Sequence, residues 1–117
     1  MTRITRSPDC GNSPKNKLVE DLAIALEMGT PDFGVLADDV RWNRADGHCL
    51  SGHAAVADGI AGTTAPGELV IERVSSHGKV GSALGRADNR PFAHFFEFAS
   101  AAAKAVVRID SFNKAER

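Results

Sequence analysis

Residues 36–60 read Leu-Ala-Asp-Asp-Val-Arg-Trp-Asn-Arg-Ala-Asp-Gly-His-Cys-Leu-Ser-Gly-His-Ala-Ala-Val-Ala-Asp-Gly-Ile. The side chains of residues 40–45 alternate in character, which predicts a strand that carries the single tryptophan, Trp42. Asp46-Gly47 is a strong turn signal, and residues 48–50 can form the returning strand. Ser51 can cap a helix that begins directly after this hairpin.

A first helix is expected to begin at Ser13-Pro14, because a capping hydroxyl is followed by a proline suited to the first helical position. Apolar residues then recur at spacings of three and four between Leu18 and Leu26, which predicts an amphipathic helix that ends at Gly29. Its acidic residues, which are expected to fall outside the apolar stripe, are Glu20, Asp21 and Glu27.

Thr30-Pro31 repeats the same start signal, and a short second helix is expected to run through Leu36 to Asp38-Asp39. Together the two helices would form a hairpin. Residues 1–12 have no apolar period and are expected to form a flexible arm. Residues 13–117 are expected to form a single domain.

Strand signals dominate the second half of the chain. Apolar runs separated by turn residues predict four consecutive antiparallel strands, at residues 69–74, 80–84, 92–98 and 105–112. A group of strands after a group of helices indicates an α+β domain, with helices packed on one face of a curved sheet.

The composition is that of one globular domain. The chain has 117 residues, 43% of them hydrophobic and 25% charged, enough for a core but too few for two domains. Its 14 basic and 15 acidic residues are dispersed and leave a formal net charge of -1, so a nucleic-acid partner is not expected. No segment approaches the roughly 18 apolar residues of a membrane span. A cytoplasmic protein without membrane contact is expected.

No cofactor or metal is expected either. The 2 cysteines, Cys10 and Cys49, and the 4 histidines lack the close spacing of a zinc site, and both thiols are expected to be reduced. The glycines match neither a dinucleotide-binding loop nor a phosphate-binding loop.

Four segments carry a family resemblance: Leu36-Ala-Asp-Asp-Val-Arg-Trp, Ser51-Gly-His-Ala-Ala-Val, Phe95-Phe-Glu-Phe and Val107-Arg-Ile-Asp-Ser-Phe-Asn. In this order they resemble the nuclear transport factor 2-like superfamily, also called the cystatin-like cone, which includes the SnoaL-like polyketide cyclases. The resemblance implies a strongly curved sheet that wraps a helix into a cone with an internal pocket for an apolar molecule. It also implies dimers that pair through the outer sheet face. Isomerases, cyclases, hydrolases and binding modules share this scaffold, so the fold leaves the function open.

The third of the late strands carries a candidate site. Phe92, His94, Phe96 and Phe98 share one face because side chains alternate along a strand, and three phenylalanines indicate that this face is buried. His94 is therefore expected to point into the pocket as an acid, a base or an orienting donor. The alternative is a core histidine satisfied by its neighbours. Trp42 and the three phenylalanines are the predicted ligand-binding residues.

Asp110 is the second candidate catalytic residue. The segment Arg108-Ile-Asp-Ser-Phe-Asn is similar to the Arg-Asp-Tyr-Phe-Asp ending of limonene epoxide hydrolases, and this resemblance implies that Asp110 helps to activate water. The alternation of the strand instead favours Val107 and Ile109 inside and a solvent-facing Asp110. Both interpretations stay open at the level of the sequence.

Two functions follow from these observations. The first is a domain that binds a hydrophobic small molecule without a complete catalytic set. The alternative is a SnoaL-like isomerase, cyclase or hydrolase, in which His94 with Asp110 moves a proton on a hydrophobic carbonyl or epoxide compound. Phe95 lies opposite the pocket face, and an exposed phenylalanine on a broad sheet favours cover by a second copy. A homodimer through the outer sheet face is therefore expected.

Overall fold

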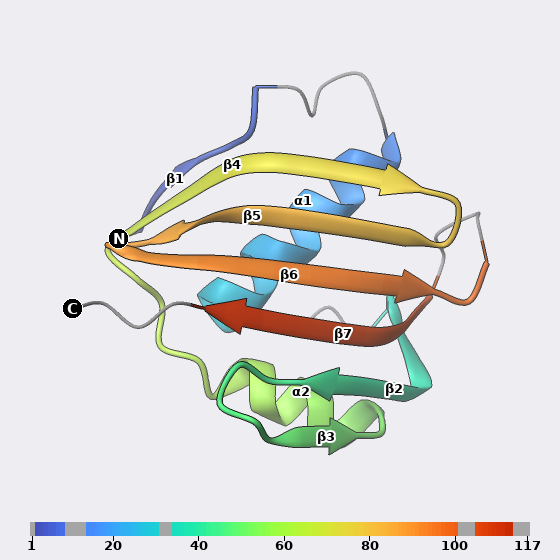
Figure 1. Ribbon diagram of the computed structural model, residues 1–117. Coiled ribbons are helices and arrows are strands. Elements are labelled where there is room, and N and C mark those ends of the chain that lie inside the picture. The colour runs from blue at the N-terminus through green and yellow to red at the C-terminus, as the bar shows by residue number, and fades with distance from the viewer. Residues whose placement is uncertain (1, 9–13, 31–33, 101–104, 114–117) are drawn as a thin grey trace.

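The computed structural model describes residues 2–8, 14–30, 34–100 and 105–113. Within them lie two helices and seven strands: β1 (Arg3–Thr5), α1 (Pro14–Met28), β2 (Leu36–Asn43), β3 (Cys49–Ser51), α2 (His53–Ala61), β4 (Glu68–His77), β5 (Val80–Ala87), β6 (Arg90–Phe98) and β7 (Val106–Asn113). The strands form one sheet in the order β1-β4-β5-β6-β7-β2-β3. Both helices lie on the same face of this sheet, α1 against β4 and β5 and α2 against β2 and β3 (Figure 1). The predicted α+β class is confirmed.

The four late strands form an antiparallel meander, as the sequence predicts. Parallel pairings of β1 with β4 and of β2 with β7 extend it on both sides and make the sheet mixed. Register shifts interrupt three of the pairings, and such irregularities bend a sheet. The register between β6 and β7 sets His94 opposite Ser111 and Phe95 opposite Asp110.

Two local predictions before and after the hairpin are wrong. Leu36 begins β2 and pairs with Val106, so the residues expected to end a second helix are extended, while residues 31–33 lie outside the described ones. Ser51 pairs with Arg41 as the last residue of β3, and Gly52, at φ 95°, takes the capping position of α2. In the first place sheet pairing supplies the backbone partners that a helix would have supplied, and in the second it holds Ser51 one position before the cap, so that no side chain caps α2.

Part of the predicted arm is anchored to the domain. Arg3–Thr5 form β1. Two atoms of the next residues then reach the buried Glu20, since Arg6 Nη1 lies 2.7 Å from its Oε1 and the Ser7 N–H donates to its Oε2 over 2.7 Å. Residues 3–7 thus contact the domain, and residues 9–12 lie outside the described ones.

The core lies between α1 and the sheet. The largest side chains with almost no exposure include Phe96, Phe98, Leu69, Ile71 and Ile109. Helix α1 adds its apolar stripe and ends where predicted, at Gly29, whose φ of 72° favours glycine. Glu20 and Glu27 are buried on this helix, contrary to the expectation that they fall outside the packed face.

Candidate functional site

His94 lies on the inner face of β6 between two phenylalanines, as the alternation predicts. Its ring centroid lies 5.0 Å from that of Phe92 and 6.4 Å from that of Phe96, and only 5% of its side chain is exposed. Both ring nitrogens are hydrogen-bonded, Nδ1 to Ser111 Oγ at 2.7 Å and Nε2 to Glu27 Oε2 at 2.6 Å. His94 is thus the centre of a buried polar chain that connects α1, β6 and β7.

Glu27 forms one end of this chain. Its second oxygen, Oε1, lies 3.3 Å from Nη2 of Arg90. Burial by itself raises the pKa of the Glu27 carboxyl, but the hydrogen bond and charge of His94, joined by Arg90, outweigh burial and hold the pKa below its ordinary value of 4.5. Glu27 is therefore a carboxylate at neutral pH, and it only accepts hydrogen bonds.

Trp42 and Ser111 form the other end. The Trp42 Nε1–H donates to Ser111 Oγ over 2.8 Å, since an indole nitrogen is a donor only. At the far end the carboxylate of Glu27 requires a hydrogen on His94 Nε2. In the neutral ring Nδ1 is then the acceptor, and the Ser111 hydroxyl donates to it. With His94 neutral, the donors run in one direction from Trp42 through Ser111 and His94 to Glu27.

A cleft of about 190 Å³ opens beside the polar chain. Its lining combines the chain with groups from the β2–β3 hairpin and the start of β6: Leu26, Glu27, Trp42, Arg44, Ala45, Asp46, Thr63, Arg90, His94, Ser111 and Asn113. The Arg44 guanidinium lies 5.0 Å from the centroid of the Trp42 ring, and its Nε is 3.9 Å from Asp46 Oδ2. The cleft therefore has an aromatic wall, a buried hydroxyl and imidazole, and charged groups of both signs.

Of the predicted ligand-binding residues, only Trp42 lines this cleft. Phe96 and Phe98 are 2% and 1% exposed and pack in the core, and Phe92 is also buried. Between α1 and the middle of the sheet the interior is filled by these rings rather than hollow. The inner cleft is more polar than the aromatic-lined pocket expected from the sequence, because its walls come from the hairpin and from α1.

Comparisons with known proteins identify the architecture. No family model matches the chain, and no curated protein matches it in sequence. A nuclear transport factor 2-like protein of unknown function from Mesorhizobium loti has a similar structure, with a TM-score of 0.68 at 14% identity over 95% of this chain and 99% of that one. A protein from Shewanella putrefaciens, provisionally named a SnoaL-like polyketide cyclase, has a TM-score of 0.65 at 10% identity over 90% and 83%.

A third similar structure, provisionally named a ketosteroid isomerase, comes from Kribbella flavida and has a TM-score of 0.60 at 13% identity over 91% of this chain and 82% of that one. The chain has the nuclear transport factor 2-like fold. The resemblance predicted from the four segments is thereby confirmed for the fold. The different names of its structural neighbours agree with the rule that a fold hosts several functions.

In this nuclear transport factor 2-like sheet, Asp110 lies on the outer face and not beside His94. It pairs with Phe95, and its carboxylate accepts hydrogen bonds from Asn43 Nδ2 over 2.6 Å and from Arg108 Nε over 3.0 Å. The structure therefore does not bring the two predicted catalytic residues together. The alternation of β7, which favours an outward Asp110, is the correct guide, and its inward neighbour is Ser111.

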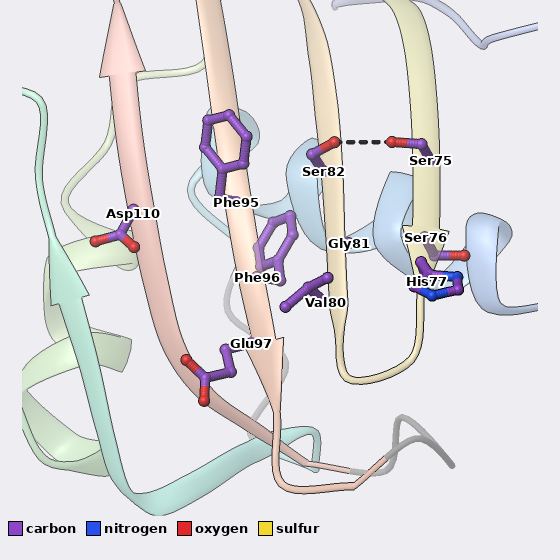
Figure 2. Close-up of a pocket in the computed structure, with 10 residues that line it drawn as sticks. All are labelled: Ser75, Ser76, His77, Val80, Gly81, Ser82, Phe95, Phe96, Glu97 and Asp110. Carbon is purple, nitrogen blue, oxygen red and sulfur yellow. Dashed lines mark hydrogen bonds between the residues drawn. The ribbon is translucent and has the colours of Figure 1, made fainter.

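A second, larger groove of about 450 Å³ lies on this outer face. Figure 2 shows its lining along β4, β5, β6 and β7, with Phe95 and Asp110 on neighbouring strands and the hydroxyls of Ser75 and Ser82 joined across β4 and β5. The groove faces away from the helices. No residue of the buried polar chain lines this groove, so the inner cleft and the outer groove are two sites with different linings.

Sequence reasoning missed Glu27 and Ser111, the two direct partners of His94. For Glu27 a signal exists in the spacing, because Glu20, Ala23 and Glu27 recur at three and four and so share a helix face with each other. For Ser111 the signal is the alternation itself, which turns this residue inward whenever Asp110 points outward. Neither pattern predicts which residue of another element lies opposite Glu27 or Ser111.

No group of three or more His, Cys, Asp or Glu side chains among the described residues could hold a metal ion. Cys49 is a free, exposed thiol, and Cys10 lies outside the described residues. Neither α1 nor α2 is long and apolar enough to cross a membrane.

Proposed function

We propose that the protein binds a compact small molecule in the inner cleft beside His94. The observation that carries this proposal is the buried chain of Trp42, Ser111, His94 and Glu27, which lines an open hollow rather than being sealed in the core. Ligand sites generally combine apolar walls with a few fixed polar groups. The inner cleft has this composition.

The size and lining of the cleft define the class of ligand. A hollow of about 190 Å³ is smaller than the roughly 300–1,000 Å³ of pockets for drug-sized ligands. The Trp42 ring favours a flat apolar part, and Ser111 favours a polar head that exchanges a hydrogen bond. We therefore expect a small ring compound with one carbonyl or carboxylate group, for which Arg44 and Arg90 supply donors.

The single tryptophan makes this proposal directly testable. Because Trp42 is the only tryptophan, its fluorescence reports on the cleft without interference. Titration with cyclohexanone, benzaldehyde and benzoate is expected to change the Trp42 emission in a saturable way with at least one of them. Ala45 is an exposed residue of the cleft lining, and Ala45→Phe adds a ring that would occupy part of the cleft. This variant should weaken binding at least about tenfold, a loss of about 1.4 kcal/mol.

The matched control lies in the other hollow. Phe95→Ser removes the main apolar side chain of the outer groove and should leave the titration unchanged. If none of the three compounds alters the emission, or if Phe95→Ser abolishes a response that Ala45→Phe leaves intact, the proposal is wrong.

The second candidate, an isomerase, cyclase or hydrolase, keeps support from one specific observation. Asp110 is on the outer face, but Glu27 supplies a carboxylate 2.6 Å from His94, so a buried acid–base pair exists after all. A carboxylate that orients a histidine is a common element of proton-transfer and nucleophilic sites. This pair replaces the predicted pairing of His94 with Asp110.

A further inference from the structure

The hydrogen bonds of His94 decide which group of the polar chain can meet a ligand. Both ring nitrogens are already engaged, one by Glu27 and the other by Ser111. A ligand in the cleft therefore cannot contact a free nitrogen of His94. The Ser111 oxygen, by contrast, donates one hydrogen bond, accepts one from Trp42 and keeps a second lone pair.

We propose that Ser111 is a nucleophile, activated by His94 and positioned through Glu27, that takes an acyl group from small activated esters. This inference rests on the proposed function, because the ester must enter the inner cleft. The reaction class that the inference implies is ester hydrolysis through a covalent acyl-serine.

The geometry meets the requirements of an activated serine. Such a site needs the nucleophile and its base, and the base and its orienting group, within about 2.6–3.2 Å of each other. The two distances here are 2.7 Å from Ser111 Oγ to His94 Nδ1 and 2.6 Å from His94 Nε2 to Glu27 Oε2. In addition, the Trp42 Nε1–H, at 2.8 Å, stabilises negative charge that develops on Oγ.

The reaction can be written with its atoms in balance. Ser111 Oγ attacks the ester carbonyl carbon, an O–C bond forms, and the hydroxyl proton moves to His94 Nδ1. The bond from that carbon to the alcohol oxygen breaks, and the leaving alkoxide takes the proton from Nδ1. Water then attacks the acyl carbon and passes a proton to Nδ1, the bond from that carbon to Ser111 Oγ breaks as Oγ takes this proton back, and the carboxylic acid is released. Glu27 holds the imidazolium in place and stabilises its charge in both halves.

The cleft also holds cationic donors for the oxyanion of the tetrahedral intermediate. Arg44 and Arg90 both line it, and each guanidinium carries several N–H groups. The formal charges of Arg44, Arg90, Asp46 and Glu27 cancel before the ester binds. A developing oxyanion therefore meets guanidinium N–H donors that are already in the site, with no net positive charge behind them.

The decisive experiment is covalent labelling of the full chain. Diisopropyl fluorophosphate transfers its phosphoryl group to an activated serine oxygen and releases fluoride. We expect one label per chain, mapped by peptide mass spectrometry to Ser111, and a burst of nitrophenolate when the protein is mixed with para-nitrophenyl acetate. Absence of the label, or its spread over serines of the outer face such as Ser75 and Ser82, would overturn the proposal.

Variants separate chemistry from folding. Ser111→Ala should reduce labelling at least about 100-fold, whereas Ser82→Ala, whose hydroxyl lies on the outer face, should leave it unchanged. Glu27→Gln keeps the shape but removes the charge and should slow labelling about 10- to 100-fold, with partial rescue by Glu27→Asp because it restores a carboxylate. Equal rates for Gln and Asp at position 27 would exclude the positioning role of Glu27.

The labelling tests whether Ser111 is a nucleophile, and the fluorescence titration tests whether the cleft binds a ligand, so one result can be negative without the other. If Ser111 stays unlabelled while Trp42 still reports saturable binding, the nucleophile is disproved and the binding function stands. If neither signal appears, the proposed function fails together with this inference.

Discussion

Glu27 shows how a single buried residue can organise a site. Its carboxylate is almost fully enclosed, and it is held by His94 and Arg90. A buried charge destabilises the folded state unless it is paired, so the folded state requires partners for Glu27. One of these partners, His94, also forms an acid–base pair with it. The same contacts that keep Glu27 ionised keep one nitrogen of His94 protonated.

The free energy of unfolding should depend on this residue and on pH. Because folding lowers the pKa of Glu27, its stabilisation is present above the unfolded value near 4.5 and is lost as the pH falls through the lower folded pKa. Glu27→Gln is expected to cost about 1–3 kcal/mol at pH 7. In urea titrations, the difference between wild type and variant should shrink as the pH is lowered from 7 to 3.

The control for this prediction is Glu68→Gln. Glu68 is exposed at the start of β4, so the substitution should change the free energy of unfolding by no more than about 0.5 kcal/mol. A difference between wild type and Glu27→Gln that stays constant with pH would contradict the ionised, paired state of Glu27.

At the scale of elements, β4 and β5 pack closely against each other in the part of the sheet that α1 covers. Gly85 on β5 lies directly opposite Ile71, next to a register shift in β4. A Cβ at this position would overlap the carbonyl oxygen of Val70 and come within 3.0 Å of the Phe92 ring. The position therefore admits only glycine without movement of backbone.

Gly85→Ala is expected to lower the free energy of unfolding by about 1–3 kcal/mol, the usual cost of overpacking. Urea denaturation followed by circular dichroism measures this loss. The matched variant Ser82→Ala, on the same strand but on the outer face, should change stability by less than about 0.5 kcal/mol. Equal stability of Gly85→Ala and wild type would show that the two strands are not this close.

At the scale of the whole molecule, helices cover only one of the two faces of the sheet. Both helices lie on the inner face, and the outer face exposes several large apolar side chains: Val80, Leu84, Phe95 and Phe112. The rings of Phe95 and Phe112 also contact each other edge to face at 5.7 Å between centroids. Arg108 and Asp110 on the same face offer both signs of charge to a partner.

We propose that a second copy of the chain covers this face, because a twofold partner would place the same patch of apolar and charged side chains against it. Light scattering at micromolar concentration should give the mass of a dimer, and Phe95→Glu should shift it to that of a monomer. The control Glu68→Gln lies away from the exposed phenylalanines and should remain dimeric. A monomeric wild-type protein would contradict the proposal.

The sequence by itself determined the features that depend on local periods. Alternation along a strand was enough to predict the inward face of His94, and the turn signals were enough to separate the four late strands. The same alternation correctly favoured an outward Asp110. These patterns are short-range, because they record only which side of one strand meets the core.

Only the tertiary structure decided what stands opposite each of these side chains. Glu27 meets His94 across 67 positions of the sequence, and Ser111 meets it through the register of β6 and β7. Pairing with β7 likewise made Leu36 part of a strand where the start signals favoured a helix. Register and long-range packing are properties of how the elements assemble, and therefore no local pattern encodes the polar chain on which the site depends.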